Sequence, residues 1–313
     1  MPPVGYVTHP DYLTHQTGFS HPERPERLQA INDHLRACGL MDELVMIPPR
    51  PAELKWLELV HGAAYIRRVE EFSRSGRAII DSMDTGISPR SYDVSLLAAG
   101  GALAAADAIL DGRVACAFAA ARPPGHHALR DVAMGFCLFN NIAITARYLQ
   151  QRHGLERILI VDWDVHHGNG TQDAFYDDPS VFFFSIHQYP FYPGTGGARE
   201  TGSGQGAGAT LNAPMQAGAG NDDYRRIFDD VLGPRVLAFK PQFILISAGF
   251  DAHREDPLGG MLLTEQGYAR LTDTVRTWAS DLCNGRVLSL LEGGYDLKAL
   301  ARSTEAHLGR LGE

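Results

Sequence analysis

Residues 158–168 read ILIVDWDVHHG, and this stretch decides the fold. Its first four residues are apolar and mostly β-branched, which predicts a short strand buried on both faces, as in parallel sheets covered by helices. The polar residues that follow lie at the carboxyl end of that strand, where open α/β sheets bind their ligands. Burying Asp162, Asp164, His166 and His167 together without compensation would be costly. The sequence therefore predicts a bound cation and, with it, a metalloenzyme.

The composition is typical of a globular protein. The chain has 313 residues, of which 44% are hydrophobic and 21% charged, and its formal net charge is −9. This charge, without a basic stripe, argues against nucleic acid as a partner. Four cysteines without a Cys-x-x-Cys pair fit a reducing compartment. Because we find neither a signal-peptide pattern nor an apolar run of about 18 residues, we expect a cytoplasmic protein that does not associate with membranes.

Strand and helix patterns alternate along the chain, which predicts an α/β fold with a central, mainly parallel β-sheet flanked by helices. No composition break marks a linker, so we expect one catalytic domain over residues 1–313. The expected strands are 4–8, 114–119, 158–161, 181–186, 242–247 and 286–291. The expected helices are 25–38, 92–110, 137–151, 224–239, 264–282 and the tail after residue 296.

Polar or glycine-rich segments follow five of these strands. They are RPPGHH (122–127), DWDVHH (162–167), SIH (185–187), AGFD (248–251) and EGGY (292–295). Parallel strands end at one shared edge of the sheet, so we expect the five segments to converge there.

Asp164, His166 and Asp251 are the candidate ligands of one metal ion. Three protein ligands leave an open coordination position, which is typical of catalytic metals. Two oxygens and one nitrogen suit Zn²⁺, and also Fe²⁺ or Mn²⁺. An isolated Asp-x-His is more often a hydrogen-bonded pair, but the clustering of acids and histidines here favours a metal site.

His126 and His127 follow two prolines and are therefore held on a stiff turn. Two imidazoles beside a metal can act as a base and an acid, with Asp162 and Asn169 as candidate partners. A bare His-His pair would instead be interpreted as two surface histidines. The expected position at the edge with the metal ligands favours the catalytic interpretation.

Tyr295 follows Gly293 and Gly294, which let the backbone pass close to a ligand. Its hydroxyl could then stabilise a developing oxyanion, although a bare Gly-Gly-Tyr is usually a turn. Together with the metal and the histidines, this arrangement predicts metal-assisted hydrolysis of an amide.

Five segments in this order resemble signature motifs of the histone deacetylase superfamily. They are RPPGHH (122–127), GFCLFN (135–140), DWDVHHGNGTQ (162–172), AGFDA (248–252) and LEGGY (291–295). They are most similar to the class II branch and its bacterial histone deacetylase-like amidohydrolases. The resemblance, from about residue 21 to residue 295, implies a single arginase/deacetylase-like α/β domain. It also implies Zn²⁺-dependent removal of acyl groups from lysine or from polyamines.

The resemblance also implies a role for each matching residue. Zinc would be bound by Asp164, His166 and Asp251, and a structural K⁺ by Asp162, Asp164, His166, Ser185 and Ile186. The catalytic residues would be His127, as base and acid, and His126, as its electrostatic companion. Asp162 and Asn169 would be the partners of these histidines, and Tyr295 would be the oxyanion donor. The substrate would meet Gly135, Phe136, Tyr192, Asp84, Leu258, Gly293 and Gly294.

Two positions narrow the expected activity. Asn169 is the class II form and leaves His127 with a neutral partner, so its basicity should be lower. Leu258 stands where a polyamine-hydrolysing branch has a glutamate, which favours an acyl-lysine peptide or protein as substrate. An acetylpolyamine amidohydrolase is the alternative, and a non-catalytic acyl-lysine-binding subunit is a lesser one. The sequence identifies neither the physiological substrate nor the preferred acyl chain. A homo-oligomer is possible, but no heptad pattern indicates the oligomeric state.

Overall fold

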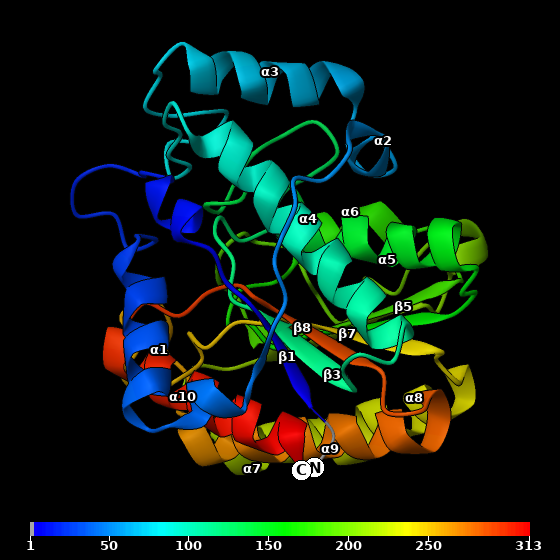
Figure 1. Ribbon diagram of the computed structural model, residues 1–313. Helices are drawn as coiled ribbons and strands as arrows, with labels where there is room; N and C mark the ends of the chain where they lie inside the picture. The colour runs from blue at the N-terminus through cyan, green and yellow to red at the C-terminus, as the bar shows by residue number, and fades with distance from the viewer. Residues whose placement is uncertain (1–2) are drawn as a thin grey trace.

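The computed structural model describes residues 3–313, and in this part of the chain eight strands form one sheet in which every pair is parallel (Figure 1). The strand order is β2-β1-β3-β8-β7-β4-β5-β6. The strands are β1 (Val4–Val7), β2 (Val45–Met46), β3 (Cys116–Ala119), β4 (Ile158–Asp162), β5 (Val181–Gln188), β6 (Thr210–Met215), β7 (Phe243–Ala248) and β8 (Val287–Leu291).

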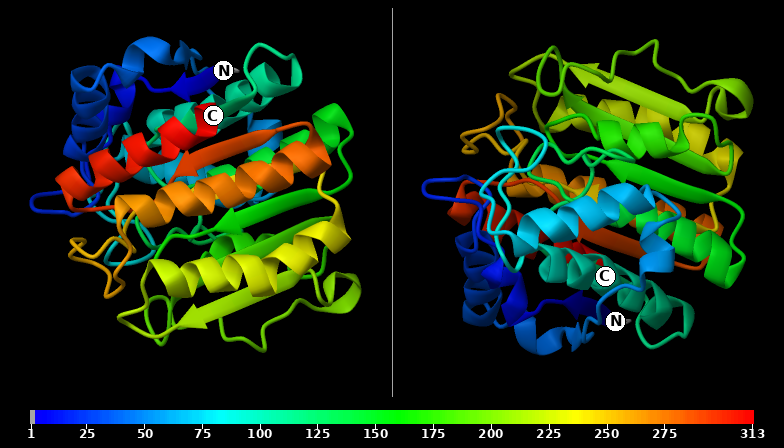
Figure 2. Two further views of the ribbon diagram at one scale, coloured as in Figure 1. Left: turned by 90° about the horizontal axis from the view of Figure 1, so that it is seen from below. Right: turned by 90° about the horizontal axis from the view of Figure 1, so that it is seen from above.

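Helices cover both faces of this sheet (Figure 2). One face is packed by α1 (Glu26–Ala37), α7 (Asn221–Arg226), α8 (Gly233–Phe239), α9 (Glu265–Cys283) and α10 (Leu297–Gly312). The other is packed by α3 (Ala63–Arg74), α4 (Ser91–Leu110), α5 (Asn141–His153) and α6 (Asn169–Phe175), with α2 (Leu54–Leu57) beside them. Short turns complete the chain: η1 (Pro10–Thr14), η2 (Leu40–Glu43), η3 (Gly204–Gly206) and the π-helical η4 (Ile227–Leu232).

Strand β4 shows why the apolar run forms the centre of the fold. Its side chains alternate between the two cores: Ile158 and Ile160 belong to one, and Leu159 and Val161 to the other. All four are fully buried. Because successive side chains of a strand point to opposite faces, only a strand that is apolar throughout can fill both layers.

The α/β class with a central parallel sheet is confirmed, and several element bounds differ from expectation. The helix expected over 137–151 begins at Asn141, because the side chain of Asn140 caps it by accepting from the Ala143 N–H at 3.0 Å. The helix expected over 224–239 is divided by η4. The sequence patterns did not indicate β2, β6, α2, α3 or α6.

Of the described residues, one helix, α4, is long and apolar enough to cross a membrane by length and composition. Most of its apolar window, 72%, is buried inside the protein. It packs against α5, β3 and β1. The burial explains its composition, since a helix that is apolar all round also occurs in the core of a large domain.

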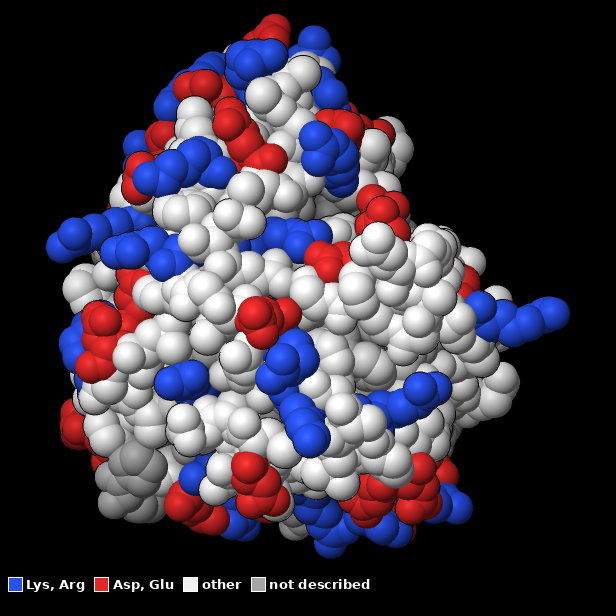
Figure 3. Space-filling view, turned by 90° about the vertical axis from the view of Figure 1, so that its right-hand side faces the viewer, with Lys and Arg blue, Asp and Glu red and all other residues white. Residues whose placement is uncertain are grey.

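Charges of both signs are interspersed on the face that Figure 3 shows, and neither sign forms a continuous stripe there. Many opposite charges are paired in the protein, for example Arg147 with Asp178 at 2.5 Å. The fields of such neighbouring opposite charges largely cancel at a distance.

Candidate active site

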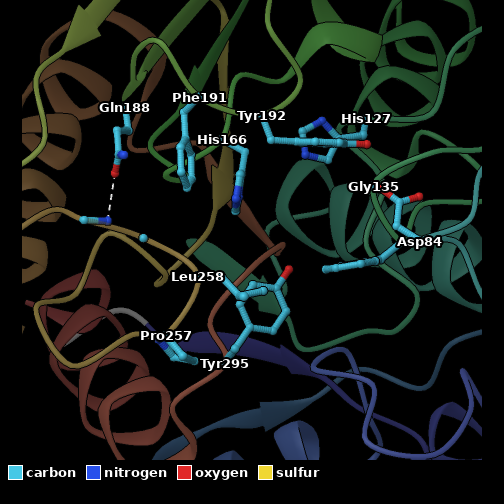
Figure 4. Close-up of a pocket in the computed structure, with 13 residues that line it drawn as sticks. Asp84, His127, Gly135, His166, Gln188, Phe191, Tyr192, Pro257, Leu258 and Tyr295 are labelled. Atoms are coloured by element: carbon cyan, nitrogen blue, oxygen red, sulfur yellow. Dashed lines mark hydrogen bonds between the residues drawn. The ribbon is translucent and has the colours of Figure 1, made fainter.

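The five strands expected to deliver the site, β3, β8, β7, β4 and β5, are consecutive in the sheet. Their carboxyl ends open into a cavity of about 430 Å³, shown in Figure 4. It is lined by Asp84, His127, Gly135, Phe136, His166, Gln188, Phe191, Tyr192, Pro257, Leu258, Gly259, Gly260 and Tyr295. Segments distant in sequence therefore converge, as the parallel arrangement requires.

Asp164, His166 and Asp251 lie together at the cavity floor, with one ligand atom of each within 4.8 Å of the others. His166 Nδ1 is 3.1 Å from Asp164 Oδ1 and 3.2 Å from Asp251 Oδ2. The second contact lacks hydrogen-bond alignment, and Asp251 Oδ2 is buried without a hydrogen-bond partner among the described residues. An orphaned buried carboxylate oxygen beside two further ligands is what a cation site requires.

The electrostatics of this group also favour a bound cation. Burial raises the pKa of Asp251 to about 7, and the neighbouring Asp164 carboxylate adds to the rise. Burial alone would lower the pKa of His166, but Asp164 and Asp251 outweigh it and raise that pKa to about 10. The two carboxylates therefore demand positive charge between them, and the donor set of two oxygens and one nitrogen fits Zn²⁺ or Fe²⁺.

His126 and His127 are held side by side, with ring centroids 4.0 Å apart. His126 Nδ1 lies 3.0 Å from Asp162 Oδ2, and His127 Nδ1 lies 2.7 Å from Asn169 Oδ1. The predicted partners are thus the observed ones.

The two rings differ in charge. Burial lowers the pKa of His126, but the carboxylates of Asp164 and Asp162 outweigh it and raise that pKa to about 10. Burial and the neighbouring His126 cation lower the pKa of His127 well below its usual value. One imidazole is therefore charged and the other neutral, which is the separation that acid–base chemistry needs.

Tyr295 stands across the cavity from His127 and His166, and its hydroxyl points toward the space between them (Figure 4). Burial raises the pKa of this phenol well above 10, so it remains a proton donor. Arg27 fixes the segment from behind: its Nε donates to the Gly294 carbonyl at 2.6 Å, and its guanidinium lies 4.9 Å from the Tyr295 ring centroid.

Two glycines allow the close approaches of this site. A Cβ at Gly293 would overlap the carboxylates of Asp251 and Asp164, and the Gly293 N–H donates to Asp164 Oδ2 at 2.8 Å. Gly135 has φ +58°, and a Cβ there would overlap the ring of His127. Glycine is required at both positions, for space at the first and for space and conformation at the second.

The cavity walls are aromatic. Phe136 lies 5.8 Å from Tyr295 between ring centroids, and Tyr192 lies 5.1 Å from His127. Phe191 stacks on His166 with centroids 5.5 Å apart and an interplanar angle of 16°. Asp84 and Leu258 also line the cavity. The aromatic walls form a passage that reaches His166, the member of the Asp164–His166–Asp251 group that lines the cavity.

Comparison with known proteins places this site in a family. The histone deacetylase domain model matches residues 21–311. The chain belongs to the histone deacetylase family. A "Probable deacetylase" of Archaeoglobus fulgidus is 45% identical over 94% of this chain and 82% of its own length. The histone deacetylase-like amidohydrolase of Pseudomonas aeruginosa is 39% identical over 94% of this chain and 76% of its own.

Two further matches bear on the activity and the fold. Human "Polyamine deacetylase HDAC10" is 44% identical over 91% of this chain, but over only 43% of its own length. The crystal structure of the HDA15 HD domain superposes with a TM-score of 0.93 at 40% identity, covering all of this chain and 89% of that one. The expected family and the arginase/deacetylase-like fold are confirmed. This histone deacetylase family protein is a hydrolase that acts on amide bonds.

The residues predicted for K⁺ are also near one another. Asp162 and Ser185 are partners in the register of β4 and β5, and Ile186 is the next residue of β5. Burial raises the pKa of Asp162 to about 6. The Ser185 hydroxyl already bonds His187 Nδ1 at 2.9 Å. Binding of K⁺ here stays a prediction.

Sequence reasoning missed two buried carboxylates that hold the site. Glu292 accepts from the backbone N–H groups of Gly125 (2.7 Å) and His126 (3.1 Å). Asp256 accepts from the Tyr295 N–H at 2.6 Å. Glu292 lies in the predicted segment 292–295, and Asp256 lies two residues before the predicted Leu258, but nothing in a sequence shows that a carboxylate will face backbone donors.

Other missed residues line the cavity: Phe191, Gln188, Pro257, Gly259 and Gly260. Phe191 adjoins the predicted Tyr192, and a pair of neighbouring aromatics was the signal available for it. His15 does not line the cavity and is fully buried against Glu23 and Ser91.

Proposed function

We propose that this protein is a Zn²⁺-dependent deacylase that removes acetyl or other acyl groups from the ε-amine of lysine in peptides or proteins. The observation that carries the proposal is the meeting of three potential ligands, a neutral histidine and a tyrosine hydroxyl in one aromatic cavity. Asp164, His166 and Asp251 would hold the ion. When bound, Zn²⁺ would polarise the amide carbonyl and lower the pKa of a water molecule.

His127 is proposed as the general base and acid. If its Nδ1–H is donated to Asn169 Oδ1, the Nε2 lone pair is free to take a proton from the attacking water and return it to the leaving amine. The low pKa of His127 keeps this nitrogen unprotonated at neutral pH. His126, charged and bonded to Asp162, would stabilise the negative charge that develops beside it.

Tyr295 is proposed to donate its hydroxyl hydrogen to the oxyanion of the tetrahedral intermediate. Gly293 and Gly294 let its segment approach the ligands, and Gly135 would accept the amide hydrogen of the substrate. The mechanism needs no serine or cysteine nucleophile.

The shape of the passage favours acyl-lysine. Phe136, Tyr192 and Phe191 offer apolar faces to a methylene chain. Among the described lining residues Asp84 is the only carboxylate, and it already accepts from the hydroxyls of Ser82 and Thr85. A free polyamine carries several positive charges, and this single carboxylate would neutralise them poorly.

The alternative is an acetylpolyamine amidohydrolase, and the similarity to the human polyamine deacetylase is the observation that favours it. A non-catalytic acyl-lysine-binding subunit fits less well, because the ligands, both histidines and Tyr295 are all present and grouped.

We further propose that residues 1–313 form one catalytic domain, that K⁺ binds near Asp162 and Ser185, and that the protein is cytoplasmic. All four cysteines are free, which is consistent with a reducing compartment.

The deciding experiment compares turnover of an acetyl-lysine peptide and of acetylspermidine by the same protein, before and after chelation and after re-addition of Zn²⁺. We expect faster turnover of the peptide, loss of both activities with chelator, and recovery with Zn²⁺. Faster turnover of acetylspermidine would establish the alternative. Binding of the peptide without turnover in the Zn²⁺-loaded protein would establish the non-catalytic function.

Leu258→Glu tests the proposed role of the mouth. A carboxylate at this half-buried position would attract a polycation, so the ratio of acetylspermidine to peptide turnover should rise about tenfold, equivalent to about 1.4 kcal/mol. Leu262→Glu is the control, since Leu262 is exposed and does not line the cavity. An unchanged ratio in Leu258→Glu would show that this residue does not select the substrate.

A further inference from the structure

A second group of potential metal ligands lies where helix α1 packs against α10, outside the residues that line the catalytic cavity. The described residues contain one such group besides the active-site triad: His34, Cys38 and Glu305, with one ligand atom of each within 4.8 Å of the others. His34 and Cys38 are four residues apart, the second just beyond the end of α1, so they lie on one face. Glu305 comes from α10, which packs against α1, and its Oε2 is 2.6 Å from His34 Nε2.

The charges around this group leave Glu305 without a competing cation. Arg302 is paired with Glu265 at 2.5 Å, and Arg310 with Glu313. No lysine or arginine pairs with Glu305 among residues 3–313. Its carboxylate is therefore partnered by an imidazole alone, and both are available to a metal ion.

We propose that His34, Cys38 and Glu305 bind a Zn²⁺ ion on the surface of the protein. An imidazole nitrogen, a thiolate sulfur and a carboxylate oxygen are ligands that zinc takes, whereas Mg²⁺ and Ca²⁺ prefer oxygen alone. Zinc bonds of about 2.0–2.3 Å would place tetrahedral ligands roughly 3.3–3.8 Å apart. The side chains are at least partly exposed, so small rotations could adjust the present spacing, which includes widening the 2.6 Å contact between His34 Nε2 and Glu305 Oε2. Water would complete the coordination.

The thiol is free for this role. Cys38 is exposed, and its Sγ makes only a long contact of 3.5 Å with the Leu35 carbonyl. The other three cysteines are buried. Cys38 is thus the accessible thiol of the four, and it stands beside the two other ligands.

A bound ion would join two helices that border the active-site segment. Helix α1 carries Arg27, which holds the Gly294 carbonyl, and α10 begins two residues after Tyr295. Zinc would therefore tie α1 to α10 at a distance from the catalytic cavity. We expect this tie to stabilise the folded protein, because a ligand that binds only the native state raises its stability.

The test uses protein loaded with its active-site metal and freed of excess ion. Equilibrium dialysis against ZnCl₂, with metal measured by mass spectrometry, should give about one additional equivalent of zinc per chain. Alkylation of Cys38 by iodoacetamide should slow at least tenfold when this zinc is present. Substitution with Co²⁺ should add a thiolate-to-cobalt charge-transfer band.

The variants Cys38→Ser, His34→Gln and Glu305→Gln should each lose the additional equivalent while keeping amide hydrolysis. His153→Gln is the matched control, because His153 pairs with Asp107 at 2.8 Å on the same kind of surface without a thiol. It should retain the additional equivalent. The proposal is overturned if the parent protein binds no additional zinc, or if His34→Gln and Glu305→Gln still protect Cys38 from alkylation.

Discussion

At the scale of single residues, the main feature of the site is that the adjacent imidazole rings of His126 and His127 differ in protonation state. Asp162 keeps the charge on His126, while Asn169 offers His127 only a neutral oxygen. The charged ring then lowers the pKa of its neighbour. Because the side chain of Asn169 is uncharged, it does not favour protonation of His127 as a carboxylate would, and His127 stays neutral, as the proposed general base must be.

Replacing Tyr295 with Phe should remove the proposed oxyanion donor and little else. We expect kcat to fall about 10²–10³-fold with KM nearly unchanged, as for the loss of one oxyanion-hole donor. Steady-state kinetics with the acetyl-lysine peptide measure this. Tyr268→Phe is the control, since that hydroxyl is also buried but has no hydrogen-bond partner within residues 3–313. Full activity in Tyr295→Phe would contradict the assignment.

Gly293→Ala should disrupt the proposed active-site metal site. The added Cβ would overlap Asp251 and Asp164, so we expect the zinc bound at this site to fall well below one equivalent and hydrolysis to be lost. Metal analysis of the purified variant measures the first effect. In Gly309→Ala, where nothing lies within 4 Å of the new Cβ, α10 should become more stable by about 0.5–1 kcal/mol. Normal metal content in Gly293→Ala would refute the steric argument.

The sequence predicted the grouping of those residues that directly follow apolar strands. Asp162, Asp164 and His166 were identifiable because the end of β4 locates them. Glu292 and Asp256 were not, because their partners are backbone N–H groups, and every residue except proline offers the same donor. The role of such a carboxylate depends on which loop crosses it, which sequence spacing does not encode.

At the scale of elements, the end of β5 determines the position of the cavity mouth. Gln188, the last residue of β5, accepts from the Gly260 N–H at 2.7 Å and so holds the 257–260 segment against the cavity (Figure 4). The same residue is fixed to Val165 by its own backbone N–H at 2.9 Å. Residues 257–260 are therefore connected to the segment that carries the proposed metal ligands Asp164 and His166.

Gln188→Ala should loosen this segment. One lost hydrogen bond of about 1 kcal/mol predicts roughly a fivefold rise in KM for the peptide with kcat nearly unchanged, because the residues around the reacting carbonyl remain in place. Gln216→Ala, on an exposed turn, is the comparison. A fall in kcat without a change in KM would assign Gln188 to the chemistry instead.

Strands with a continuous apolar run were predicted, as for β4, β7 and β8, whose residues are apolar except for Asp162, Ser247 and Ser289. Helix α3 was missed although it has an apolar face, and β6 was missed because it lacks an apolar run. Strand β6, with the sequence TLNAPM, lies at the edge of the sheet and contains proline and asparagine. Edge strands tolerate both residues, because one side of the strand makes no ladder bonds, so their composition resembles that of a loop.

At the scale of the whole molecule, one buried ion cluster joins the N-terminal segment to the sheet. The Glu23 carboxylate pairs with Arg122, which follows β3, and with Arg27 of α1 at 3.2 Å. Arg122 also donates to the carbonyls of Tyr12 (3.0 Å) and His15 (3.2 Å). All three charged side chains are fully buried, so removing one partner leaves an uncompensated charge.

Glu23→Gln should lower the free energy of unfolding at pH 7 by roughly 3–5 kcal/mol. Burial alone would raise the pKa of Glu23, but Arg122 outweighs it and holds that pKa at about 2. This lies below the unfolded value of about 4.3, so the stabilisation is present above pH 4.3 and is lost as the pH falls toward 2.

Urea unfolding at several pH values measures the difference between parent and variant. The difference should be constant near neutrality and narrow below about pH 4. Asp229→Asn, which breaks an exposed pair with Arg225, should change stability by less than about 1 kcal/mol. A parent–variant difference that widened in acid would contradict the assigned charge state of Glu23.

The adjacency of β3, β8, β7, β4 and β5 bears on biosynthesis. His127 and Tyr295 are separated by more than half of the polypeptide, and β8, the last strand in the sequence, lies between β7 and the much earlier β3. A nascent chain still missing its final strand can therefore present no complete reaction centre, however much of the sheet has assembled. Enzyme activity should therefore appear late and abruptly during translation. The formation of product would report directly that β8 has inserted into the sheet.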